Sequence, residues 1–166
     1  MSTALDSLAR RLDRVAAGLL GLLLLALVAL NVVNAAGRYL FGRSLPGADE
    51  ILLYGMIWLV FLGMIQVTAK RRHLQLDLLE RWLPGRGKLL QRLLVDLLIA
   101  ILCGYLASQS MLVVERLGSI GQTSMAAGLP MAWVHGGLLV GLGATAFTAG
   151  LQAILGVLRL LRGLSP

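Results

Sequence analysis

Long stretches without Asp, Glu, Lys or Arg dominate the polar pattern of this chain. Four of them are long enough to hold a span, and they comprise residues 15–37, 51–69, 97–114 and 117–158. About 20 apolar residues cross the hydrocarbon core of a bilayer as a helix. The last stretch holds one span only, because Gly118 to Gly128 is rich in Gly, Ser, Thr and Gln and is typical of a loop. The pattern predicts one all-α membrane domain, residues 1–166, with four transmembrane helices at about residues 15–36, 49–69, 89–114 and 130–158.

The polar segments between these spans carry two weaker helical patterns. Residues 1–14 place three Leu side chains at helical spacing opposite charged residues, which indicates a short interfacial amphipathic helix. Apolar residues also recur at helical spacing in the segment of about 73–83, which ends in Trp82 and Pro84-Gly85. This segment is expected to lie in the membrane interface with its Trp at headgroup depth.

Lys and Arg are distributed unevenly between the two sides of the predicted bundle. The N-terminus, the 70–92 segment and the C-terminal tail together hold 12 of them, whereas the 37–48 and 115–129 loops hold 3. Because positive residues stay cytoplasmic, a multi-pass protein of the bacterial inner membrane with both termini inside is predicted. The net charge of +7 thus reflects topology within a lipid bilayer, and nucleic acid is not expected as a partner.

Composition excludes several classes of function. The chain is 58% hydrophobic, above the roughly 45–50% of soluble domains. With only 14% charged residues and four spans, no room for an extra soluble domain is expected. The single Cys103 forms no internal disulfide and has no ligand cluster around it. His73 and His135 are predicted near opposite faces of the membrane, which disfavours a shared haem or metal. We expect no enzymatic activity and no cofactor in this chain.

Ionisable groups are absent from the middle third of every predicted span. Proton relays and ion sites in membranes rely on such groups, so a packing role is favoured over conduction. Asp96 is the most embedded carboxylate, about one turn into the third span and four residues after Arg92. It suits a proton or cation site, or an ion pair with a snorkelling Arg92 at the boundary, and we favour the ion pair.

Several residues suggest helix contacts or docking. The fourth span repeats small residues at the spacing that lets helices approach closely, and it is expected to meet a helix of this chain or of a partner; these residues are Gly137, Gly141, Ala146 and Gly150. Asn31 and Asn34 suit hydrogen bonds to a neighbouring helix. Asp49 and Glu50 suit capping of the second span. With Arg38 and Arg43 they also form an outward charged cluster to which a soluble protein could dock.

Three motifs, taken in order, resemble one transporter family. Residues 38–50 (RYLFGRSLPGADE) lead into the second span, residues 70–77 (KRRHLQLD) follow it, and residues 123–133 (TSMAAGLPMAW) precede the fourth span. Over about residues 10–160 the chain resembles the small membrane subunit of tripartite ATP-independent periplasmic (TRAP) transporters. It departs from the family pattern at Gly47-Ala48, where an aromatic residue is frequent, and at Arg72, where Gly is frequent.

The resemblance implies a role in a three-part secondary transporter. A periplasmic solute-binding protein would capture an organic acid, and a large polytopic subunit would bind solute and sodium. The small subunit would pack against the large one as a static scaffold and help to dock the binding protein. Arg38, Glu50, His73 and Asp77 match family positions, with implied roles at helix ends and interfaces. The alternative is a self-sufficient small multidrug-type proton-coupled exporter, which needs a buried carboxylate, usually in the first span.

Overall fold

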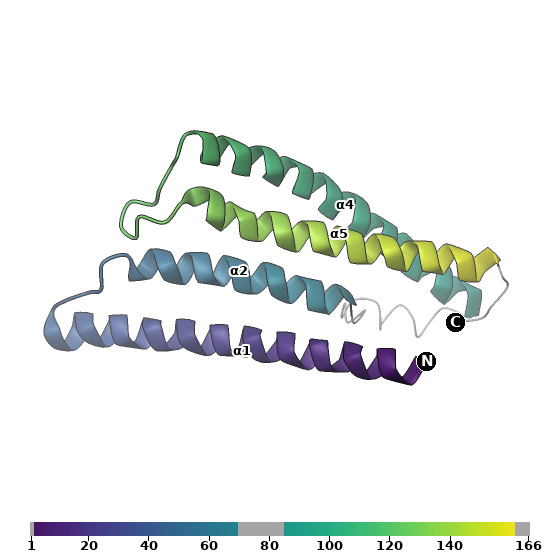
Figure 1. The fold of residues 1–166 in the computed structure, drawn as a ribbon, viewed down its shortest axis with the longest axis horizontal. Helices are drawn as coiled ribbons and strands as arrows, with labels where there is room; N and C mark the ends of the chain where they lie inside the picture. Colours follow the sequence, from purple (N-terminus) through teal and green to yellow (C-terminus); the bar gives the residue numbers. More distant parts are fainter. Residues whose placement is uncertain (1, 70–84, 162–166) are drawn as a thin grey trace.

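The computed structural model describes residues 2–69 and 85–161, and this part of the chain consists of four long helices (Figure 1). They are α1 (Ser2–Phe41), α2 (Ala48–Ala69), α4 (Gly85–Ser119) and α5 (Met131–Leu161). Each is long and apolar enough to cross a membrane. The predicted all-α fold with four spans is therefore confirmed, whereas the segment of about 73–83, with His73 and Asp77, lies outside the described residues.

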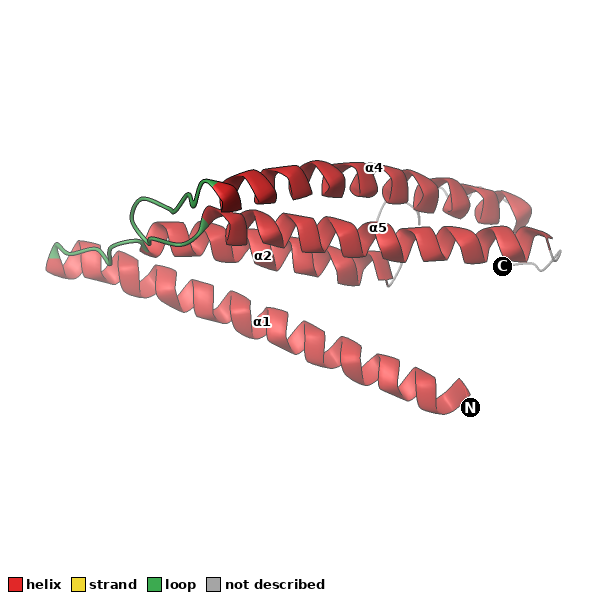
Figure 2. Ribbon diagram, turned by 45° about the horizontal axis from the view of Figure 1, so that its top comes forward, coloured by secondary structure: helices red, strands yellow, loops and turns green. Residues whose placement is uncertain are grey.

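Figure 1 shows the helices running along a common direction, with the α1–α2 and α4–α5 connections at the same end. We call this end, with residues 42–47 and 120–130, the loop end; the N-terminus lies at the opposite, terminal end. α5 packs on both α4 and α2, and α2 packs on α1. Figure 2 shows α1 diverging from the other helices toward its N-terminus. The fold is thus a three-helix unit with α1 attached to its α2 side.

Two helices run past the charged residues that bound the predicted spans. α1 includes residues 2–14 without a break and continues beyond Arg38, while α4 continues beyond Arg116. Charge marks where a helix leaves the hydrocarbon, but turn geometry decides where it ends. α4 ends in a Schellman motif, in which Gly121 has φ +61° and the Gln122 amide donates to the Leu117 carbonyl at 3.2 Å.

Small residues on α5 allow the close packing of the three-helix unit. A Cβ added at Gly141 would lie 2.5 Å from the Phe61 Cβ, so α2 and α5 touch almost backbone to backbone there. On the α4 side, Cys103, Ala107 and Leu142 form a buried cluster. Close approach of this kind drives helix association where lipid removes the hydrophobic contrast.

Candidate functional site

The loop end is held together by the carboxylate of Glu50, in the first turn of α2. It accepts hydrogen bonds from the backbone amides of Ala127 at 2.8 Å and Ala126 at 3.2 Å, and Ser124 is a further partner. Consecutive backbone N–H groups of this kind form a concave site that suits an anion. Gly47 packs under the same segment, where an added Cβ would lie 2.9 Å from the Ala127 Cα. We call this contact the Glu50 latch; it fixes the α4–α5 connection onto the start of α2.

The α4–α5 connection is also ordered by its own hydrogen bonds. The Ser124 amide donates to the Leu129 carbonyl at 2.8 Å, and the Leu129 amide donates back to the Ser124 hydroxyl at 3.1 Å. The Met131 amide donates to the Gln122 carbonyl at 2.9 Å. The segment that its composition predicts as a loop is therefore an ordered connection, in which hydrogen bonds join its first residues to its last ones. A Ser hydroxyl that bonds nearby backbone is a frequent local motif, and Ser124 was missed among the candidate residues.

Asn34 connects α1 to α2 at the same end. It is only 2% exposed; its Nδ2 donates to Asp49 Oδ1 at 3.0 Å, and its Oδ1 accepts from the Leu45 amide at 2.9 Å. Arg38 adds an ion pair to the other Asp49 oxygen at 3.4 Å. Most of the charged cluster therefore makes contacts within the chain. Asp49 binds side chains of α1, and Glu50 binds backbone amides of the 124–127 segment. Arg43 is exposed.

Three of the four small residues singled out on α5 face other helices of the same chain. Gly137 and Gly141 are buried, and an added Cβ at either would meet Trp58 or Phe61 of α2. Ala146 packs on the α4 cluster, whereas an added Cβ at Gly150 would meet nothing within 4 Å. Helices of the same chain therefore account for the contacts of Gly137, Gly141 and Ala146. A role of the four small residues at a partner interface stays a prediction.

A second polar contact, missed from the sequence, closes the terminal end of the α2–α5 pair. Gln152 Nε2 of α5 donates to the Thr68 carbonyl of α2 at 3.1 Å and lies 3.5 Å from that of Ala69. The last carbonyls of a helix have no partner within it, so Gln152 caps α2 from outside. The Thr68 hydroxyl donates back to the Met64 carbonyl at 3.0 Å. α2 is thus attached at both ends to the α4–α5 hairpin.

The titratable candidates do not converge on one site. Asp96 is 8% exposed in α4, and both it and Arg92 take part in polar or electrostatic interactions. His135 lies in α5 near the loop end, where its carbonyl accepts a hydrogen bond from Ser110 at 3.5 Å. Within residues 2–69 and 85–161, no three His, Cys, Asp or Glu side chains are grouped as for a metal.

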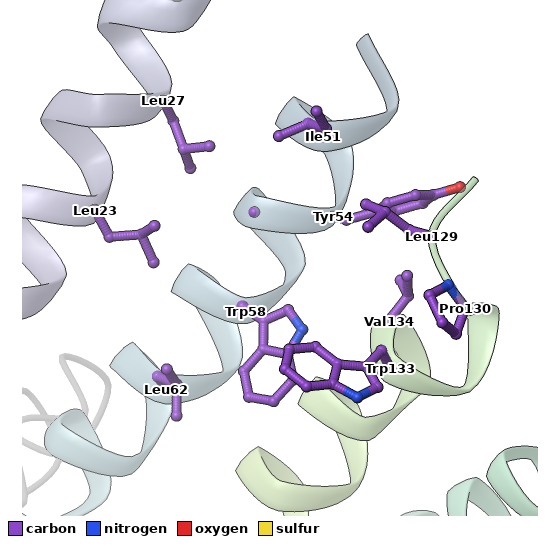
Figure 3. Close-up of a pocket in the computed structure, with 11 residues that line it drawn as sticks. Leu23, Leu27, Ile51, Tyr54, Trp58, Leu62, Leu129, Pro130, Trp133 and Val134 are labelled. Atoms are coloured by element: carbon purple, nitrogen blue, oxygen red, sulfur yellow. The ribbon is translucent and has the colours of Figure 1, made fainter. Parts of the chain in front are cut away.

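Two apolar grooves flank the contact between Leu27 of α1 and Gly55 of α2. The first, of about 790 Å³, lies between α1, α2 and α5 and is walled by Trp58 and Trp133, whose ring centroids are 6.4 Å apart (Figure 3). The second, of about 480 Å³, lies on the other side of Leu27, between α1 and α2; we call it the α1–α2 groove. Asn31 and Asp49 line it among apolar side chains. Asn31 is exposed and makes no hydrogen bond among the described residues.

Comparison with known proteins places this architecture in one family. Residues 24–162 match the family model described as tripartite ATP-independent periplasmic transporters, DctQ component. The chain is also similar to a Haemophilus influenzae protein named as a TRAP transporter small permease, with 31% identity over 81 residues. That match covers 48% of this chain and 50% of the relative, so the chain spans about half of its length. The family is a transporter component, and four helices of spanning length agree with a multi-pass membrane protein. From the extent of the family match, we conclude that this chain belongs to the DctQ component family of TRAP transporters.

Proposed function

We propose that the chain is the small permease subunit of a TRAP-type secondary transporter and acts as a static scaffold for a large polytopic transport subunit. The observation that carries this proposal is that α2 is attached to the α4–α5 hairpin at both ends, by Glu50 and by Gln152. Between these contacts, Gly141 brings α2 and α5 almost into backbone contact. A unit fixed in this way has little freedom to open alternately to the two sides of the membrane, but it suits a support for a subunit that moves.

The direct test is purification in mild detergent after co-expression with the large subunit of the same transporter. We expect a stable complex, and we expect transport by reconstituted vesicles only when both subunits and the binding protein are present. Quantitative recovery of the chain alone from membranes that contain the large subunit would contradict the proposal.

We further propose that the loop end faces the periplasm and helps to dock the solute-binding protein during sodium-driven uptake of an organic acid. The support is the charge distribution, with 3 Lys and Arg residues in the loops at this end and 12 elsewhere, and the rigid geometry of the Glu50 latch. Sodium would be bound by the large subunit.

Met125 is fully exposed at the loop end, so Met125→Cys in a Cys103→Ser background should react in whole cells with a maleimide that cannot cross the inner membrane. Labelling only after cell lysis would contradict this orientation.

The alternative function is a self-sufficient proton-coupled exporter. The observation in its favour is the burial of Asp96, and the observation against it is that Asp96 lies in α4, with no carboxylate between Asp13 and Phe41 of α1. Vesicles that contain this chain alone decide the question. Proton-driven efflux that Asp96→Asn abolishes would establish the exporter and exclude a purely supporting role.

A further inference from the structure

We propose that the α1–α2 groove binds one phospholipid whose headgroup carries both a phosphate and a primary ammonium. Its phosphate would bind Arg38, its ammonium would bind Asp49, its glycerol ester would bind Asn31, and an acyl chain would occupy the groove. This site belongs to the chain itself and does not depend on the transport role proposed above.

The length of the groove fits one leaflet. Its α2 wall runs from Asp49, in the first turn, to Val60, 11 residues further along the helix. At about 1.5 Å per residue this is roughly 16 Å, close to half of the approximately 30 Å hydrocarbon core. The groove therefore extends from the headgroup boundary at the loop end to about the middle of the membrane, which is the depth that one acyl chain occupies.

The walls of the groove suit a flexible chain better than a partner helix. Helices pack in membranes on Gly, Ala, Ser and Thr, which let two backbones approach. The residues that line this groove include none of these small types; they are Leu, Val and Met side chains together with Asn31 and Asp49. An acyl chain can follow such an uneven surface, whereas a rigid helix would rest on the tips of the long side chains.

The charges at the mouth of the groove complement a zwitterionic headgroup. The side chains of Arg38 and Asp49 are 52% and 77% exposed. Their ion pair of 3.4 Å and the Asn34 hydrogen bond leave further guanidinium N–H groups and further lone pairs on the carboxylate unused. A guanidinium binds phosphate oxygens through parallel N–H bonds, and a carboxylate accepts several N–H donors. A phosphate and a primary ammonium on one headgroup would satisfy both side chains without leaving a net charge.

Asn31 supplies a third contact below this pair. It lines the groove two turns before Arg38 on the same face of α1, exposed and without a hydrogen bond in the part of the chain that the structure describes. A polar group that faces hydrocarbon without a partner is costly. The ester carbonyls of a phospholipid lie just below its phosphate, where the Asn31 amide can donate to them.

The test measures which lipid the purified chain retains. The chain is equilibrated in detergent with equal amounts of phosphatidylethanolamine, phosphatidylglycerol and phosphatidylcholine, washed on a column, and extracted for mass spectrometry. We expect about one tightly held phospholipid per chain, enriched at least about threefold in phosphatidylethanolamine. Phosphatidylglycerol lacks the ammonium, and phosphatidylcholine has no N–H donor for Asp49. Equal retention of the three lipids would overturn the headgroup assignment.

Variants locate the lipid. Arg38→Gln should lower the retained lipid roughly tenfold, the scale of one lost charge-assisted contact. The groove-filling Leu53→Trp should also lower it, because the larger side chain takes the volume of the acyl chain. The matched controls are Arg43→Gln at the same end and Leu98→Trp on an exposed face of α4, which should retain the lipid of the unmodified chain. Equal loss in controls and variants would overturn the site. Displacement of the lipid when the large subunit is co-purified would also overturn it, because a partner helix would then fill the groove.

Discussion

The Glu50 carboxylate lies 2.8 Å from the backbone amide of Ala127, which is 77 residues further along the chain. This contact joins the first turn of α2 to the connection between α4 and α5 (Figure 1). Glu50 is negatively charged and lies at the N-terminus of its own helix. It therefore also interacts favourably with the positive end of the α2 dipole. One side chain therefore stabilises a helix start and the tertiary arrangement of the loop end together.

Removal of the Glu50 latch should loosen the loop end. Glu50→Ala leaves the Ala126 and Ala127 amides without their acceptor, which we expect to lower the free energy of unfolding. Glu50→Gln should cost less, since its amide oxygen can still accept one N–H. The measurement is equilibrium unfolding in mixed detergent micelles. Glu115→Ala, an exposed carboxylate near the same end, is the control and should change stability little; equal losses in both variants would contradict the latch.

Gly141 should tolerate no side chain. In Gly141→Ala the new Cβ would lie 2.5 Å from the Phe61 Cβ and 2.8 Å from the Phe61 carbonyl oxygen, so α2 and α5 must move apart. We expect a loss of about 1–3 kcal/mol, as for overpacked cores. Gly143→Ala on the same helix meets nothing within 4 Å and is the matched control. Since the clash involves Phe61 backbone, Phe61→Ala should not rescue Gly141→Ala; a full rescue would show that the helices do not approach as described.

Loss of Gln152 should lower the stability of the chain more than loss of an exposed glutamine. Gln152→Leu removes the external donor to the Thr68 carbonyl at the end of α2, and the loss is expected to be about 0.5–2 kcal/mol. Thermal unfolding in mild detergent measures it, with the exposed Gln109→Leu of α4 as the control. A Gln152→Leu variant as stable as the control would mean that water or lipid satisfies those carbonyls equally well.

The pair of Asn34 and Asp49 permits a test by exchange. Asn34→Asp places a carboxylate at a buried position next to the exposed carboxylate of Asp49. Burial of the new charge and its repulsion from Asp49 should destabilise the chain by about 1–3 kcal/mol. Adding Asp49→Asn to this variant restores one amide and one carboxylate, now with the carboxylate at position 34 and the amide at position 49. The double variant should therefore recover most of the loss, as a double-mutant cycle of unfolding free energies would show. Additive losses would mean that the two side chains do not interact.

The main elements of the fold were predictable, but the partners of individual residues were less so. Asn34 was expected to bond across helices, and it does so. For Gly137 and Gly141 the sequence pattern did not decide between contact with a helix of this chain and contact with a partner's helix, because both kinds of contact need the same small residues. Gln152, Ser124 and the Ala126 and Ala127 amides gave no usable signal. Backbone N–H groups carry no residue-specific pattern, and Gln152 meets a helix 83 or 84 residues away in the sequence.

The sequence by itself determined that the chain has four helices long and apolar enough to cross a membrane. Transfer of each side chain from water to hydrocarbon is a local property that sums along a segment, so no neighbour is needed to evaluate it. The tertiary structure alone decided which faces meet, because in lipid every apolar face is equally well solvated. There the choice depends on backbone approach at Gly141 and on a few hydrogen bonds, such as those of Glu50 and Gln152, that join distant parts of the chain.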